Sequence, residues 1–101
     1  MPEKRQHARK PVNLPASITL LASQAQYPGT CRDLSIGGMF VETQARAAFG
    51  DKLSVSLDLP GGPVVMQAVV RWTAPDGLGL QFGLMGARET HAIVTILTGK
   101  R

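Results

Sequence analysis

The stretch Lys52–Pro63, KLSVSLDLPGGP, decides the fold class of this 101-residue chain. Apolar side chains occupy every second position and alternate with serine or aspartate, which is the period of a half-buried β-strand. The Pro-Gly-Gly-Pro sequence that follows is typical of a tight turn. A second alternating stretch, residues 64–73, comes directly after it. The pattern therefore predicts a β-hairpin.

Short apolar stretches separated by turn residues continue on both sides of this hairpin. They predict four further strands, over residues 14–22, 26–34, 38–42 and 78–84. After Gly86 the period changes to that of an amphipathic helix over 87–98, which Gly99 ends. The apolar side of that helix carries Ile93, Ile96 and Leu97. Pro28 and Gly29 weaken the second strand and indicate an edge position or a bulge.

Length and composition allow one domain with its own core. The chain is 44% hydrophobic and 18% charged, which argues against disorder. Six short strands followed by one helix predict an all-β fold, a six-stranded antiparallel β-barrel with a C-terminal α-helix. We expect residues 1–13 to form a flexible basic arm, residues 14–84 the barrel and residues 86–99 the helix.

The net charge of +4 is concentrated near the N-terminus, where four of the eleven basic residues lie within ten positions: Lys4, Arg5, Arg9 and Lys10. This clustering favours an anionic partner for the arm, although a solvated basic tail would have the same composition. Pro11 argues against a stable helix in the arm. No apolar run approaches a membrane span and no signal peptide is visible, so we expect a cytoplasmic protein without membrane insertion.

The residues offer no catalytic or metal centre. His7 and His91 lie far apart in the sequence and have no other ligand at metal-binding spacing. Ser35 lies two residues after Asp33 and has no histidine to activate it. The single cysteine, Cys31, excludes an internal disulfide and is interpreted as a small apolar strand residue. We therefore expect no enzyme, no metal and no cofactor, which leaves recognition.

Arginine, aspartate and serine together suit a ligand that contains guanine and phosphate. Arginine forms bidentate bonds to the O6 and N7 atoms of guanine, pairs with phosphates and stacks on bases. Aspartate accepts hydrogen bonds from the amino and imino donors on the other edge of guanine, and serine can bond to base or phosphate. Asp33 and Ser35 would share one face of a strand, and Gly37 and Gly38 after them leave the backbone bare.

The motifs that carry these residues resemble those of a known family. Residues 5–9, RQHAR, fit RxxxR, and residues 33–38, DLSIGG, fit [D/N]xSxxG. In this order, and with the glycine-spaced stretch GLGLQF at 77–82, they are similar to the PilZ domain over essentially the whole chain. The resemblance implies a bacterial six-stranded β-barrel that binds the second messenger cyclic di-GMP (c-di-GMP). We therefore expect a non-enzymatic receptor that relays the signal to a protein partner.

The resemblance also implies roles for individual residues. Arg5 and Arg9 would hold guanine edges and phosphates from the arm, while Asp33 and Ser35 would contact a base from the barrel. Gly38 would allow close approach of the ligand.

Four further residues are weaker candidates for ligand contact. Lys4 directly precedes the arginine motif, at a position that could determine whether one or two ligand molecules bind. Gly37 would extend the stretch of backbone without side chains that a ligand could approach. Arg71 and Trp72 could supply a stacking surface. For Trp72 we favour core packing, because Met66, Ala68 and Val70 are predicted on its face.

Three other interpretations remain open. Asp33 and Ser35 could serve only the turn before the third strand. The chain could be a PilZ-like protein–protein adaptor with a vestigial nucleotide site. It could also bind single-stranded nucleic acid, although five aromatic residues offer few stacking platforms, so we expect no DNA or RNA partner.

Overall fold

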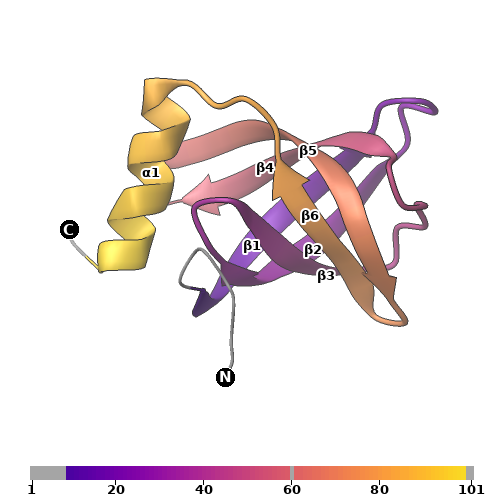
Figure 1. Cartoon of the computed structure of the whole chain (residues 1–101), viewed down its shortest axis with the longest axis horizontal. Coiled ribbons are helices and arrows are strands. Elements are labelled where there is room, and N and C mark those ends of the chain that lie inside the picture. Colours follow the sequence, from indigo (N-terminus) through magenta and orange to yellow (C-terminus); the bar gives the residue numbers. More distant parts are fainter. Residues whose placement is uncertain (1–8, 60, 100–101) are drawn as a thin grey trace.

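Six antiparallel strands close into a barrel, and one helix follows them (Figure 1). The computed structural model describes residues 9–59 and 61–99. Its elements are β1 (Lys10–Leu20), β2 (Gln26–Leu34), β3 (Gly38–Thr43), β4 (Lys52–Leu59), β5 (Gly62–Ala74), β6 (Gly77–Phe82) and α1 (Ala87–Thr98). Around the barrel the strands follow the order β1-β2-β3-β6-β5-β4, and every neighbouring pair is antiparallel. The predicted fold class is confirmed.

The alternating side chains of the strands fill the barrel interior. Leu53, Val55 and Leu57 of β4 are completely buried, as the period of two predicts. They pack with inward residues of the other strands, among them Ile18, Cys31, Leu34, Met39, Val41, Met66, Val70, Leu78 and Leu80. The prediction that Cys31 is an ordinary core residue is thereby confirmed.

Strand β1 begins at Lys10, four residues before the predicted start. Lys10 pairs with Leu34 and Pro11 with Asp33, after which the register shifts before Leu14. Two prolines and this irregularity remove the alternation that marks a strand in sequence. The first two residues of β1 are therefore held in the strand by pairing with the end of β2 that carries Asp33.

The predicted edge position of Pro28 is wrong, because β2 lies between β1 and β3 in the closed barrel. The pairing with β3 starts one residue later, at Gly29, so the missing N–H of Pro28 interrupts no bond in that ladder. The carbonyl of Pro28 accepts a hydrogen bond from the Thr43 hydroxyl at 2.8 Å. The bulge in β2 falls later, at Arg32.

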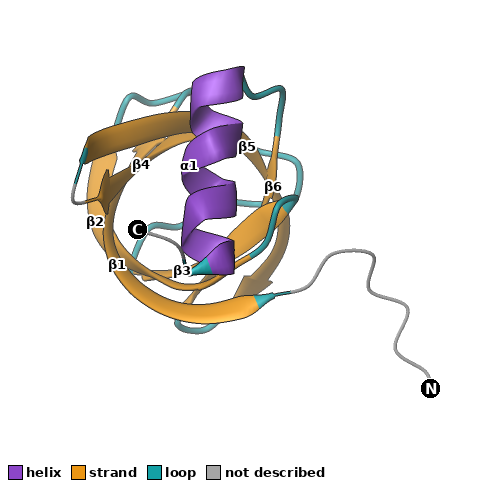
Figure 2. Ribbon diagram, turned by 90° about the vertical axis from the view of Figure 1, so that its left-hand side faces the viewer, coloured by secondary structure: helices purple, strands orange, loops and turns teal. Residues whose placement is uncertain are grey.

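Helix α1 lies across one open end of the barrel (Figure 2). Ile93 is fully buried, and Ile96 and Leu97 pack against the core, as the helical pattern predicts. Gly99 ends the helix in the left-handed region, with φ of 72°, and its N–H bonds to the carbonyls of Thr95 and Ile96. Among the described residues, no helix has the length and apolarity that crossing a membrane requires.

Candidate functional site

The two sequence motifs meet at an ion pair between Arg9 and Asp33. The Arg9 Nε donates to Asp33 Oδ1 at 3.0 Å, and Nη2 donates to the same oxygen. The side chains remain 28% and 36% exposed, so the pair lies at the surface. Pairing of Pro11 with Asp33 holds the two strands together beside it. The structure thus joins the second arginine of RxxxR to the aspartate of DxSxxG, whereas Arg5 and Lys4 lie outside the described residues.

Ser35 does not share a face with Asp33, and this part of the sequence prediction is wrong. Strand β2 ends at Leu34, so the period of two stops before Ser35, which is 2% exposed. Its Oγ accepts hydrogen bonds from the N–H groups of Gly37 and Gly38, each at 3.2 Å, and donates to the Gly38 carbonyl at 3.3 Å. Ser35 therefore organises the turn, as the turn interpretation expected, and direct contact with a ligand stays a prediction.

Gly38 permits a close approach, and the group that approaches it in this structure is strand β6. A Cβ at position 38 would lie 2.1 Å from the Leu80 carbonyl oxygen, which is far inside contact distance. The carbonyl of neighbouring Gly37 accepts a hydrogen bond from the Phe82 N–H at 2.9 Å. The glycine pair therefore joins the motif turn to β6, and its contact with a ligand stays a prediction.

Trp72 lies outside the barrel, so the expectation of core packing is wrong. The register of β5 against β6 shifts between Val70 and Trp72, and this bulge at Arg71 ends the inward alternation of the strand. Trp72 is 51% exposed. Its ring lies flat over Gly79, where an added Cβ would stand 2.2 Å from the indole. It stacks on Phe40 with ring centroids 5.1 Å apart and 15° between the planes.

This aromatic stack lies beside the ion pair on the outer face of the barrel. Asp33 is paired with Phe40 across β2 and β3, Phe40 with Gly79 across β3 and β6, and Gly79 with Trp72 across β6 and β5. Phe40 is not identified as part of this surface in the sequence analysis, because in the sequence it looks like one more apolar strand residue. The glycine at position 79, which leaves room for a ring, is the signal that could have found the stack.

The Arg71 side chain lies against Phe49 and not against the stack of Trp72 on Phe40. Its guanidinium carbon lies 5.6 Å from the centroid of the Phe49 ring, in the loop between β3 and β4. Phe49 itself is 70% exposed. The structure therefore brings Arg9, Asp33 and the 35–38 turn together with Trp72 nearby, and places Arg71 against another loop.

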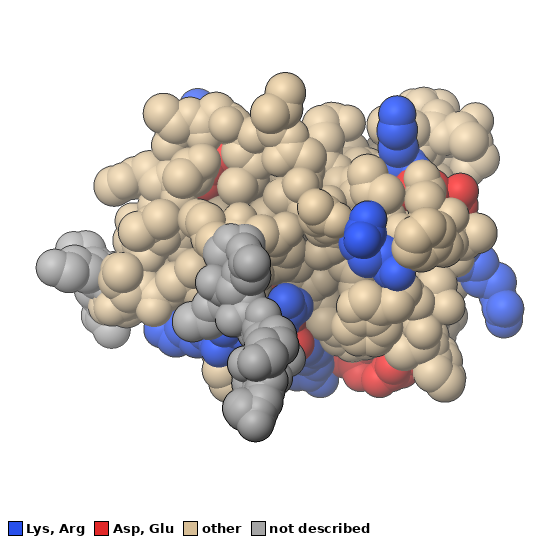
Figure 3. All heavy atoms as spheres, in the orientation of Figure 1, with Lys and Arg blue, Asp and Glu red and all other residues tan. Residues whose placement is uncertain are grey.

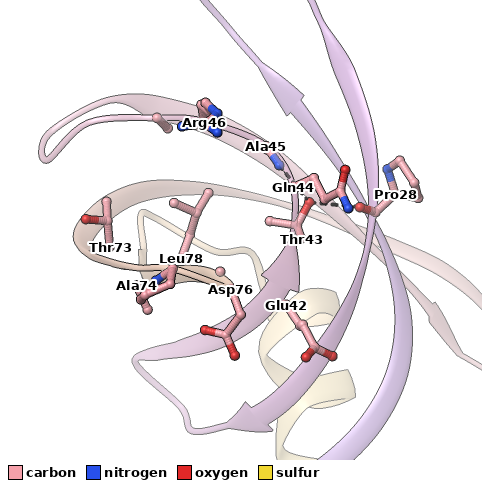
Figure 4. A pocket seen from close by; sticks show the side chains of 13 residues that line it. Pro28, Glu42, Thr43, Gln44, Ala45, Arg46, Thr73, Ala74, Asp76 and Leu78 are labelled. Carbon is pink, nitrogen blue, oxygen red and sulfur yellow. Dashed lines mark hydrogen bonds between the residues drawn. The ribbon is translucent and has the colours of Figure 1, made fainter.

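A cavity of about 1090 Å³ opens elsewhere, between the segment after β3 and the β5–β6 turn (Figure 4). Arg46 lies on one side of it, and the carboxylates of Glu42 and Asp76 lie on another. Neither Arg9 nor Asp33 lines this cavity. Its mixed charges favour no single ligand class, so the motif-bearing surface remains the better candidate site.

Charge on the described surface is distributed in patches. On the face shown in Figure 3, Lys and Arg occur in several separate groups with Asp and Glu between them. In the described part of the chain the ion pairs are Arg9–Asp33 and Arg32–Glu42, and the second is an exposed pair on the neighbouring strands. An exposed pair of this kind contributes little to stability. The Arg9–Asp33 pair differs because it joins the two motifs.

The chain is thus a small, closed antiparallel β-barrel that brings its two sequence motifs together on the outer face. The model of the PilZ domain family matches residues 3–99, and this chain belongs to that family. The resemblance predicted from the two motifs is therefore confirmed.

Solved structures with the same fold share little sequence with this chain. The PilZ domain of YcgR from Escherichia coli, solved with c-di-GMP, is 14% identical, with a TM-score of 0.80 over 96% of this chain and 91% of that one. The PilZ domain of CeSA from a cellulose-synthesizing bacterium is 16% identical, with a TM-score of 0.74 over 91% and 96%.

The same fold occurs in part of a longer protein. The MrkH–c-di-GMP complex of K. pneumonia is 16% identical, with a TM-score of 0.74 over 95% of this chain and 52% of MrkH. This chain thus spans about half the length of MrkH. No curated protein sequence matches it.

Proposed function

We propose that this chain is a bacterial cytoplasmic receptor for c-di-GMP that binds the dinucleotide at the Arg9–Asp33 surface and passes the signal to a protein partner without catalysing a reaction. The observation that carries the proposal is the ion pair that joins the RxxxR and DxSxxG motifs. Membership of the PilZ family and the c-di-GMP bound by the YcgR and MrkH structures support it.

The chemistry of the pair suits a guanine nucleotide. The Asp33 carboxylate has acceptor sites beyond the oxygen that Arg9 occupies, and guanine offers imino and amino donors to it. Arg9 uses Nε and Nη2 on Asp33, and its remaining N–H donors can reach a phosphate or the O6 and N7 edge. Arg5 would add a second guanidinium. Ser35 and the two glycines would contribute mainly by holding the turn next to this pair.

The exposed stack of Trp72 on Phe40 extends this surface. It places the Trp72 ring on the same outer face as Asp33, in a line of cross-strand neighbours that runs from Asp33 through Phe40 and Gly79. A flat purine can stack on such a ring. We therefore assign Trp72 a contact with the second base or the ribose-phosphate ring of the ligand, and give Arg71 a lower rank because it faces Phe49.

Isothermal titration calorimetry with c-di-GMP tests the proposal. Because one good bidentate base contact contributes about 1–3 kcal/mol, Arg9→Ala should weaken binding about tenfold or more. Arg46→Ala, which removes the same charge from the wall of the cavity that neither Arg9 nor Asp33 lines, is the matched control and should bind like the unchanged chain. Binding should weaken as salt rises, because the contacts are between charges. No detectable heat at moderate salt would defeat the proposal.

The adaptor interpretation makes the opposite prediction. A protein partner that binds equally well to the chain and to an Arg5→Ala/Arg9→Ala variant, with and without c-di-GMP, would favour an adaptor with a vestigial nucleotide site. One structural relative of this chain, MrkH, is described as a c-di-GMP-dependent transcription regulatory factor. A gel-shift experiment with DNA and single-stranded RNA therefore belongs beside the titration, and we expect no shift.

A further inference from the structure

Lys10 connects the base of the predicted ligand arm to helix α1. Its ammonium donates a hydrogen bond to the Ile96 carbonyl at 3.0 Å, across 86 positions of sequence. That carbonyl also accepts the N–H of Gly99, the residue that ends the helix. A cation at this place satisfies a terminal carbonyl and interacts favourably with the negative end of the helix dipole. The last turn of α1 contains no basic residue of its own.

Lys10 directly follows Arg9, and the two side chains bind different parts of the molecule. Successive residues of an extended chain point to opposite sides, so Arg9 reaches Asp33 while Lys10 reaches the helix. Lys10 is also the first residue of β1 and pairs with Leu34, the last residue of β2. The position of Arg9 is thus determined on one side by Asp33 and on the other by the end of α1.

We propose that Lys10 is a positioning residue of the c-di-GMP site, which holds Arg9 in place by capping the C-terminal turn of α1. This inference rests on the proposed function. Because coupling between two sites is reciprocal, a contact that favours ligand binding at Arg9 is itself favoured by the ligand. Binding of c-di-GMP should therefore stabilise the last turn of α1. A downstream partner that contacts the C-terminal end of α1 would then bind differently to the ligand-bound and the ligand-free protein.

Two measurements on the full chain test this inference. In titrations with c-di-GMP, Lys10→Met should lower the affinity by about fivefold or more, which is the lower end of common coupling factors. Lys10→Arg keeps a cationic donor and should restore most of the affinity. Lys52→Met removes the same charge at the start of β4, which pairs with the far end of β1, and should bind like the unchanged chain.

Amide hydrogen exchange separates positioning from a merely structural role. In the unchanged chain, c-di-GMP should slow exchange at Thr98 and Gly99, whereas in Lys10→Met it should leave these amides unaffected. In the ligand-free state, Lys10→Met should already exchange faster there, because the cap is lost. The same exchange measurement on Lys52→Met should match the unchanged chain.

The possible outcomes are distinguishable. If the unchanged chain binds no c-di-GMP, the proposed function fails and this inference fails with it. If the chain binds c-di-GMP but Lys10→Met binds it equally well or more tightly, the inference alone is overturned. The inference is also overturned if c-di-GMP binds to the unchanged chain without slowing amide exchange at Thr98 and Gly99. Slower exchange on binding, together with weaker binding by Lys10→Met and rescue by Lys10→Arg, supports it.

Discussion

Ser35 shows how one hydroxyl can hold the turn of the DxSxxG motif in shape. It is almost completely buried, and its oxygen serves the N–H groups of both glycines that follow. A small residue without a hydroxyl would leave these donors without an acceptor. The serine of the motif is therefore required by the turn, whether or not it also contacts a ligand.

Ser35→Ala should lower the free energy of unfolding by about 1–3 kcal/mol, the cost of leaving buried polar groups unsatisfied. Urea denaturation followed by circular dichroism measures this. Ser54→Ala, on the half-buried face of β4, is the matched control and should stay within about 0.5 kcal/mol. An unchanged urea midpoint for Ser35→Ala would contradict the turn role.

Gly38→Ala should be more damaging, because the new methyl would collide with the backbone carbonyl of Leu80. A backbone atom cannot rotate away, so strands β3 and β6 would have to separate. We expect a loss of about 3 kcal/mol or more in unfolding free energy, at the upper end of overpacking effects. Gly61→Ala adds the same methyl in open space and should leave stability nearly unchanged. A Gly38→Ala variant with the stability of the unchanged chain would show that the backbone at position 38 has room for a methyl group beside the Leu80 carbonyl.

At the scale of elements, the sequence predicts what depends on neighbours along the chain. The six strands, the helix and its buried Ile93 follow from hydrophobic periods of two and 3.6. The bulges at Arg32 and Arg71 do not, because a bulge is defined by the register against a partner strand. For this reason the exposure of Trp72 could not be predicted from its own strand.

In the candidate site, too, features that depend on neighbours along the chain were predictable and contacts between distant elements were not. The two motifs predict that Arg9 and Asp33 serve one ligand site, which stays a prediction, and the structure brings the two side chains together in an ion pair. The stack on Phe40 and the bond from Lys10 to the helix join elements that are distant in sequence. Nothing in the local pattern of either residue marks these contacts.

The exposed position of Trp72 on β5 gives a direct optical test, since it is the only tryptophan in the chain. We expect efficient fluorescence quenching by acrylamide in the ligand-free protein, because half of the side chain is open to solvent. Addition of c-di-GMP should reduce the quenching by covering the ring. The Arg9→Ala variant, at the same sub-saturating ligand concentration, should show clearly less protection. Weak quenching without ligand would indicate that Trp72 is buried after all.

For the whole molecule, the barrel interior determines the behaviour of the single thiol. Burial, and to a smaller extent the negative charge of Asp33, raises the pKa of Cys31 from 9.0 to about 12. The unfolded chain therefore loses this proton at lower pH than the folded one. The contribution to stability is fully present below pH 9 and is lost as the pH rises through about 12.

Thermal unfolding between pH 8 and 11 tests this expectation. The unchanged chain should lose stability with rising pH more steeply than Cys31→Val, which lacks the titrating group but fills the same apolar site. All other residues are the same in both proteins, so the difference between the two slopes isolates the thiol. Parallel slopes would show that Cys31 is not shielded from water.

The way the barrel closes also determines the order in which the site can assemble during folding. The 35–38 turn belongs to the local β2–β3 hairpin, whereas β1–β4 and β3–β6 pair strands that are distant along the chain. Pairings of this kind are slow to form, and proteins dominated by them commonly fold in milliseconds to seconds. The hairpin is therefore expected early, and the stack of Trp72 on Phe40 only when the barrel is complete. A ligand that requires both would bind the finished barrel alone and thereby oppose its unfolding.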